Sequence, residues 1–116
     1  MGITIRKVTR KDADFMKFAL HEATPLLEED IIASVEMILK EALPAGDPVL
    51  IAEEDGELIG VHLTVVNRHG MAYERGIATG YCTYVRPESR QQGVATLLRE
   101  ESFKILKQLN IKTIMG

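Results

Sequence analysis

The residues best suited to chemistry lie in one short stretch, VRPESRQQGVATLLRE, which spans positions 85–100. A β-branched residue and a proline end a strand-like segment there, and Gly93-x-Ala95 opens an amphipathic run typical of a helix. The first amides of a helix have no partner inside it, and the helix dipole adds partial positive charge at that end. Small residues let a bulky anion approach these amides. The turn therefore predicts phosphate binding, and an ordinary strand-to-helix turn is the alternative interpretation.

The whole segment YVRPESRQQGVATLL resembles the acetyl-CoA signature of the GNAT superfamily of N-acyltransferases. That signature is a strand ending in Val-x-Pro, followed by Arg/Gln-x-x-Gly-x-Gly/Ala at the start of a helix. Here it is met by Val85, Pro87, Arg90, Gly93 and Ala95. Because the order of the elements expected before it also matches the family, the resemblance covers essentially the whole chain.

The resemblance implies a site for acetyl-CoA (CoA) as co-substrate. Backbone amides of the motif would hold the CoA diphosphate, with the side chain of Arg90 beside them. These amides would be those of Gln91, Gln92, Gly93, Val94, Ala95 and Thr96. The end of the preceding strand would pair through its backbone with the pantetheine arm, at Thr83, Tyr84 and Val85. An amide there would point at the thioester carbonyl and stabilise the oxyanion.

The resemblance also implies a reaction. The protein would be an N-acetyltransferase, a transferase that moves acetyl from acetyl-CoA directly to a primary amine without a covalent enzyme intermediate. The acceptor would be a small-molecule or peptide amine, and the catalytic residues, a general acid and a general base, stay unassigned. A second hypothesis is a catalytically silent CoA-binding or oligomerisation module, and a third is an interaction domain that keeps only the turn.

A general base would take a proton from the attacking ammonium, and a histidine, a glutamate or a tyrosine acting through water could serve. His62 lies within an apolar alternation, so we expect a packed, hydrogen-bonded imidazole there rather than a base. His21 and Glu22 lie late in the first expected helix, which lines the acceptor groove in the family, but solvent exposure is the expectation for both. Tyr73 and Glu74 are further candidates in an expected loop.

Side chains alternate along the expected strand over residues 77–85, so Tyr81 and Thr83 share one face while Cys82 and Tyr84 share the other. The sequence leaves open which face borders the site. Cys82 is the single cysteine, and with no neighbouring cation to activate its thiol we expect a small buried residue. No paired metal-ligand spacing is present, so no metal is expected. The acidic run 28–30 fits the start of a helix, where negative charge complements the dipole.

Hydrophobic periodicity predicts the elements that position the motif. The expected elements are a strand over Ile3–Val8, a helix from the capping box Thr9-x-x-Asp12 to about Ala23, a helix over Leu27–Leu43, two strands flanking Asp55-Gly56, a strand over Ile77–Val85, a helix over Val94–Leu109 and a strand from Ile111. The order β-α-α-β-β-β-α-β predicts an α/β (α+β) fold, a GNAT-like mixed sheet, in a single domain over residues 1–116.

The apolar stripes of the three helices predict which residues are buried. These are Phe15, Met16, Ala19, Leu20 and Ala23 in the first helix, Ile31, Val35, Ile38, Leu39 and Ala42 in the second, and Val94, Leu97, Leu98, Ile105, Leu106 and Leu109 in the last.

Composition favours a cytoplasmic protein with no nucleic-acid or membrane partner. The chain has 116 residues, of which 46% are hydrophobic and 27% charged, and its formal net charge is −3. Such a chain has no excess of positive charge that would attract nucleic acid or anionic lipid. No apolar run approaches the roughly 20 residues that cross a bilayer, and the N-terminus lacks the apolar core of a signal peptide.

Members of the family normally continue beyond the strand that begins at Ile111, with a further helix and closing strands that often carry a tyrosine acid. This sequence stops at Gly116, so we expect IKTIM to form an unpaired apolar edge. Such an edge favours pairing with another chain, and a homodimer through it is the expected assembly. Truncation of a longer protein and a partner that supplies the missing half are the alternatives.

Overall fold

The computed structural model describes residues 2–68 and 76–115. Its helices are α1 (Ala13–Ala23), α2 (Glu28–Met37) and α3 (Val94–Gln108), with 3₁₀ turns at Arg10–Asp12 and Pro87–Ser89 and a π-helical stretch at Ile38–Ala42. Its strands are β1 (Ile3–Lys7), β2 (Val49–Glu54), β3 (Glu57–Val66), β4 (Ile77–Val85) and β5 (Thr113–Met115). This order of elements confirms the predicted mixed α/β fold.

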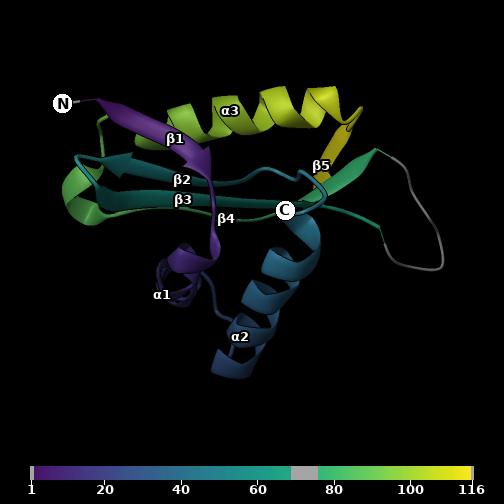
Figure 1. Cartoon of the computed structure of the whole chain (residues 1–116), viewed down its shortest axis with the longest axis horizontal. Helices are drawn as coiled ribbons and strands as arrows, with labels where there is room; N and C mark the ends of the chain where they lie inside the picture. The colour runs from purple at the N-terminus through teal and green to yellow at the C-terminus, as the bar shows by residue number, and fades with distance from the viewer. Residues whose placement is uncertain (1, 69–75, 116) are drawn as a thin grey trace.

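The five strands form one sheet in the order β1-β2-β3-β4-β5. Neighbours from β1 to β4 are antiparallel, whereas β5 lies parallel to the start of β4. Helices α1 and α2 cover one face of the sheet and α3 covers the other (Figure 1). A parallel pair needs a crossover connection, and α3 provides it between β4 and β5.

The predicted capping box is present at the start of the first helix, where it opens a 3₁₀ turn before α1. The Thr9 N–H donates to Asp12 Oδ2 over 2.7 Å, and the Arg6 guanidinium donates to both carboxylate oxygens of Asp12 over 2.8 and 3.0 Å. Burial by itself would raise the pKa of Asp12, but the hydrogen bonds from Arg6 and Thr9 outweigh it and hold that pKa below its usual range.

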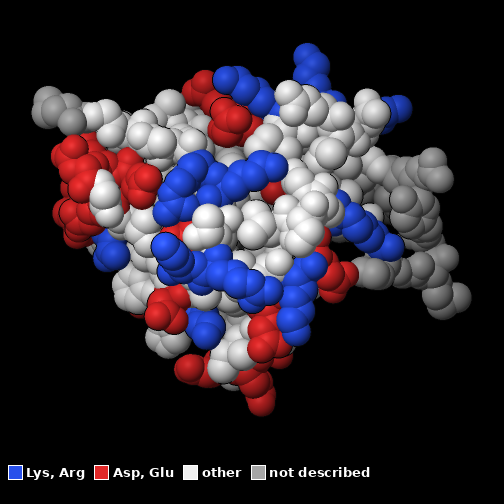
Figure 2. Space-filling model, in the orientation of Figure 1, with Lys and Arg blue, Asp and Glu red and all other residues white. Residues whose placement is uncertain are grey.

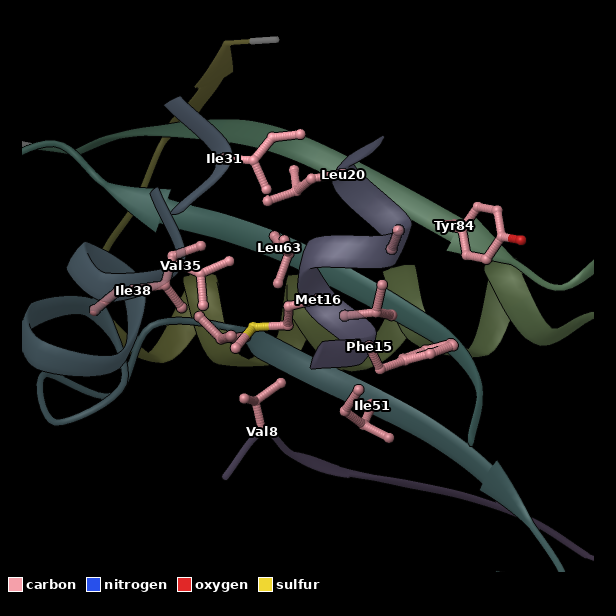
Figure 3. Packing of buried hydrophobic residues seen from close by; sticks show 14 of the residues in the cluster. Val8, Phe15, Met16, Leu20, Ile31, Val35, Ile38, Ile51, Leu63 and Tyr84 are labelled. Carbon is pink, nitrogen blue, oxygen red and sulfur yellow. The ribbon is translucent and has the colours of Figure 1, made fainter. Parts of the chain in front are cut away.

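Two apolar clusters fill the spaces on either side of the sheet. In the larger one, Met16, Leu20 and Val35 meet over Leu63 of β3 (Figure 3). The smaller one lies between the sheet and α3. It consists of Leu50, Ala52, Ile59, Val85, Val94 and Leu98. The start of α3 is therefore fixed to the sheet by its own first turn.

Three residues predicted to be buried are exposed, and the helix geometry explains why. Leu97 is 41% exposed and Leu109 is 38% exposed, because α3 contacts the sheet along a narrow stripe of four-residue steps. That stripe includes Ser102, which an apolar pattern does not identify. Ala23, the last residue of α1, is also exposed.

Buried and paired charges connect segments that are distant in the sequence. Asp47 is fully buried, and its carboxylate accepts hydrogen bonds from the Arg68 guanidinium and, over 3.0 Å, from the Val66 N–H. This pair joins the turn before β2 to the end of β3. No helix in the described ranges 2–68 and 76–115 is long and apolar enough to cross a membrane.

Lys and Arg side chains gather on one face of the molecule, over β1 and the start of α1 (Figure 2). Arg6 of β1 already pairs there with Asp12 and, over 3.3 Å, with Glu53. The strand β1 is the edge of the sheet opposite to β5.

Candidate functional site

The turn predicted to bind phosphate joins the end of β4 to α3. After the 3₁₀ turn Pro87–Ser89 the chain passes through two left-handed residues, Gln91 at φ +67° and Gly93 at φ +78°. A Cβ on Gly93 would meet no atom within 4 Å, so the backbone angle rather than crowding favours glycine. Left-handed residues in such a turn form a concave array of backbone N–H groups that suits an anion.

The backbone amides of this turn have no carbonyl partner among the described residues. Within the described part of the chain, no backbone carbonyl accepts the N–H of any residue from 91 to 96. The first hydrogen bond of the helix runs from the Leu97 N–H to the Gly93 carbonyl over 3.0 Å. These N–H groups, together with the dipole of a helix of 15 residues, make the turn a site of positive potential built from the backbone.

Arg90 is held at the mouth of this turn by two contacts. Its Nε donates to the Val85 carbonyl over 2.9 Å. Its guanidinium carbon lies 5.8 Å from the centre of the Tyr84 ring, within range of a cation–π contact. The side chain therefore adds a fixed positive charge beside the free amides.

A cavity of about 520 Å³ lies in front of the turn. It is lined by Glu22, Ala23, Thr83, Tyr84, Val85, Ser89, Arg90, Gln91, Gly93, Val94, Ala95 and Thr96. Every residue predicted to bind acetyl-CoA lines it except Gln92, which is exposed. The end of α1 forms the opposite wall, which the motif did not predict.

The edge of β4 directs backbone groups that pair with no strand of the described chain into this cavity. The Arg86 N–H donates to the Ile59 carbonyl of β3 over 2.8 Å, so by strand alternation Tyr84 also directs its backbone toward β3. Thr83 and Val85 direct theirs to the other side, where β5 pairs only with residues 77–79 of the described chain. Of the three positions predicted to pair with a pantetheine arm, Thr83 and Val85 therefore have the required orientation and Tyr84 does not.

His62 is buried and hydrogen-bonded, as predicted. Its Nδ1 lies 2.7 Å from Thr83 Oγ1, and its Nε2 lies 2.7 Å from Thr64 Oγ1. Burial, with a smaller effect from the charge of Arg99, lowers the pKa of His62 to about 4. The imidazole is therefore neutral at physiological pH, and each ring nitrogen faces a hydroxyl group.

The family model of the GNAT acetyltransferases matches residues 13–115, a range that contains both walls of the cavity and the whole β4–α3 turn. The chain belongs to the acetyltransferase (GNAT) family. No curated protein matches the sequence.

Solved structures of GNAT proteins have the same fold. An acetyltransferase of the GNAT family from Staphylococcus aureus superposes with a TM-score of 0.81 at 14% identity, covering 97% of this chain and 71% of that one. The aminoglycoside N-acetyltransferase AAC(6')-Iy in complex with CoA gives 0.75 at 18%, covering 98% and 75%. The ribosomal-protein-S18-alanine N-acetyltransferase from Escherichia coli gives 0.72 at 17%, covering 97% and 64%.

A second cavity of this GNAT domain, of about 410 Å³, continues along the same edge of β4. It is lined by His62, Gly80, Tyr81, Cys82, Thr83, Arg99, Ile114 and Met115. Thr83 lines both cavities. The sequence left open which face of β4 borders the site. In the structure Tyr84 packs against α1 on one face, whereas the hydroxyl of Thr83 reaches His62 on the other face, which α3 covers.

The remaining candidates of the GNAT domain have different outcomes. His21 and Glu22 are both exposed, as predicted, and Glu22 is the one that lines the first cavity. Burial raises the pKa of the Cys82 thiol to about 11, so the thiol is protonated at neutral pH. Tyr73 and Glu74 lie outside the described residues.

The described residues contain no group of three or more His, Cys, Asp or Glu side chains that could hold a metal ion.

Two features of the site were not identified from the sequence. Gly60 of β3 lies under α3, where an added Cβ would be 3.1 Å from the Tyr84 carbonyl oxygen and 3.3 Å from Val94 Cγ1. The contact between His62 and Thr83 depends on the register of β3 and β4. A glycine within an apolar strand was a signal for a close approach, but the partner of a cross-strand pair has no local signal.

Proposed function

We propose that this GNAT domain is an N-acetyltransferase that binds acetyl-CoA in the cavity along β4 and transfers the acetyl group directly to a primary amine. The observation that carries the proposal is the run of unpartnered amides from residue 91 to residue 96, next to Arg90 and facing the cavity. A diphosphate needs several donors and positive charge in one place, and this turn supplies both.

The rest of the co-substrate would lie along the open edge of β4. The outward backbone groups of Thr83 and Val85 would pair with the amide-containing pantetheine arm, although the Val85 carbonyl already accepts from Arg90. The thioester would then lie beside Thr83, where a backbone N–H can stabilise the oxyanion. CoA complexes among structurally similar proteins, such as that of AAC(6')-Iy, support CoA as the ligand.

The acceptor would be a small-molecule or peptide amine that reaches the thioester past the end of α1. The nitrogen of the neutral amine bonds to the acetyl carbon, the carbon–sulfur bond breaks, and CoA leaves as the thiolate. The nitrogen loses one proton to solvent, and the thiolate takes one up from solvent to give the CoA thiol. Direct transfer is favoured because the nearby thiol, Cys82, is protonated at neutral pH. Glu22 is a carboxylate at the cavity wall that would attract a cationic amine.

Calorimetric titration with CoA tests the binding step. Gly93→Ala forces a side chain into a left-handed conformation in the turn, and we expect CoA affinity to fall roughly tenfold or more, since a strained turn moves its amides. Gly56→Ala is the matched control, because Gly56 also has a positive φ (+80°) and open space around it but lies in the β2–β3 turn. Equal losses in both variants, or no binding by the unaltered protein, would contradict the proposal.

Thiol release from acetyl-CoA in the presence of a panel of amines tests the transfer step. Amine-dependent release is the expected result. CoA binding without release for any amine would favour the alternative function, a catalytically silent CoA-binding or oligomerisation module.

We also propose that two copies of the chain associate through β5. Within residues 2–68 and 76–115, no strand pairs with the outer edge of β5, and Ile114 and Met115 are 46% and 53% exposed. An apolar strand edge in this state favours pairing with a second copy.

A further inference from the structure

Three side chains form a hydrogen-bonded row from β3 to β4, which ends at the edge of the first cavity. Thr64 Oγ1 lies 2.7 Å from His62 Nε2, and His62 Nδ1 lies 2.7 Å from Thr83 Oγ1. Thr64 is 2% exposed and His62 is 8% exposed, whereas Thr83 is only partly buried. The Thr64 end of this row is therefore shielded from solvent, whereas the Thr83 hydroxyl at the other end is accessible.

The positions of the protons follow from the buried end. Among the described residues, the structure gives the Thr64 hydroxyl no hydrogen-bond partner other than His62 Nε2. A buried hydroxyl that fails to donate costs about 1–3 kcal/mol, so the Thr64 O–H donates to Nε2. The neutral imidazole then carries its proton on Nδ1 and donates it to Thr83 Oγ1. The hydroxyl proton of Thr83 remains free for a further acceptor.

The residue that carries this hydroxyl borders both cavities. Thr83 lines both of them. Its backbone N–H points to the same open edge of β4, because Thr83 and His62 form a pair whose backbone groups turn away from each other. Thr83 thus presents two hydrogen-bond donors, its backbone N–H at the open edge of β4 and its hydroxyl on the α3 side of the strand.

We propose that the Thr83 hydroxyl is a second donor to the thioester carbonyl of the bound acyl-CoA, and that His62 is the positioning residue that directs it there. This inference rests on the proposed function. When the amine nitrogen bonds to the carbonyl carbon, the carbonyl electron pair moves to oxygen, and both donors of Thr83 stabilise that charge. The pair then returns as the carbon–sulfur bond breaks, and the hydroxyl keeps its proton throughout.

Binding of two unreactive CoA derivatives tests the contact without turnover. The dethia analogue of acetyl-CoA keeps the carbonyl, and S-ethyl-CoA replaces it with a methylene. We expect the unaltered protein to bind the carbonyl analogue more tightly than S-ethyl-CoA. In Thr83→Val the ratio of the two dissociation constants should shrink roughly tenfold, which corresponds to the free energy of one hydrogen bond. Thr83→Ser should keep it.

Thr79→Val is the matched control for this experiment. Thr79 lies on the same strand, but its hydroxyl donates to Asn67 over 2.9 Å and it lines neither cavity. Its preference should equal that of the unaltered protein. If Thr83→Val fails to fold by circular dichroism, Thr83→Ala replaces it.

Kinetics test the role of His62. Thr83→Val should lower kcat by roughly 10² while changing KM little, since the hydroxyl acts on charge that develops in the transition state. His62→Gln should lower kcat in the unaltered background but have no further effect in the Thr83→Val background. Equal effects in both backgrounds would assign His62 a structural role and overturn its positioning role.

The outcomes separate this inference from the proposed function. If the unaltered protein binds neither derivative, both fail. If it binds both and Thr83→Val keeps the full preference for the carbonyl analogue, the acetyl-CoA site stands and the role of the Thr83 hydroxyl is overturned.

Discussion

Burial of His62 makes the stability of the fold depend on pH. The pKa of this imidazole is about 4 in the folded chain and about 6.5 when unfolded. Between these values the unfolded chain binds a proton that the folded chain does not, so stability falls as the pH falls from about 6.5 to about 4. The total loss from this group is roughly 3 kcal/mol, and none of it occurs above pH 7 or so.

Urea denaturation at several pH values measures this effect. His62→Gln should remove most of the slope between pH 6.5 and 4. His21→Gln is the control, because His21 is exposed at the end of α1, and its replacement should leave the slope in place. A slope unchanged in His62→Gln would show that other groups cause it.

At the scale of elements, the position of α3 depends on a glycine in β3. A Cβ on Gly60 would lie 3.1 Å from the Tyr84 carbonyl oxygen, 3.3 Å from Val94 Cγ1 and 3.4 Å from Leu98 Cδ1. Val94 and Leu98 are the first buried residues of α3. A larger residue at position 60 would therefore push away the helix start that carries the proposed CoA-binding amides.

Gly60→Ala should destabilise the fold by about 1–3 kcal/mol, the usual cost of overfilling a packed core. Chemical denaturation measures this loss, and titration should show weaker CoA binding in the same variant. Gly80→Ala is the stability control, since a Cβ there would meet its nearest atoms at an ordinary 3.8 Å. Equal stability of the two variants would refute the claim that Gly60 sets the helix position.

At the scale of the whole molecule, the open edge of β5 predicts the oligomeric state. Light scattering behind a sizing column should give a dimer mass at tens of micromolar. Ile114→Lys should shift the mass to the monomer, because charges on an edge strand oppose pairing. Ile32→Lys changes an isoleucine of similar exposure on α2, 40% against 46%, and should leave the dimer intact. A monomer mass for the unaltered chain would overturn the proposed association.

The order and approximate bounds of the elements, and the family to which the chain belongs, could be predicted from the amino-acid sequence alone. Periodicity is local: alternation predicted β4, the Asp55-Gly56 turn predicted the β2–β3 hairpin, and glycine marked the start of α3. The motif likewise lies within a few residues of sequence, so its position at a strand–helix junction could be predicted without knowledge of distant contacts.

Which side chains meet could not be predicted before the packed fold was known. The pairing of His62 with Thr83 depends on strand register, and the place of Glu22 in the cavity wall depends on how α1 crosses the end of β4. The burial of Leu97 was predicted wrongly because α3 buries only one residue in four against the sheet, and Leu97 lies beside that row. Such relations arise from packing between segments far apart in the chain, and no local pattern of residues records them.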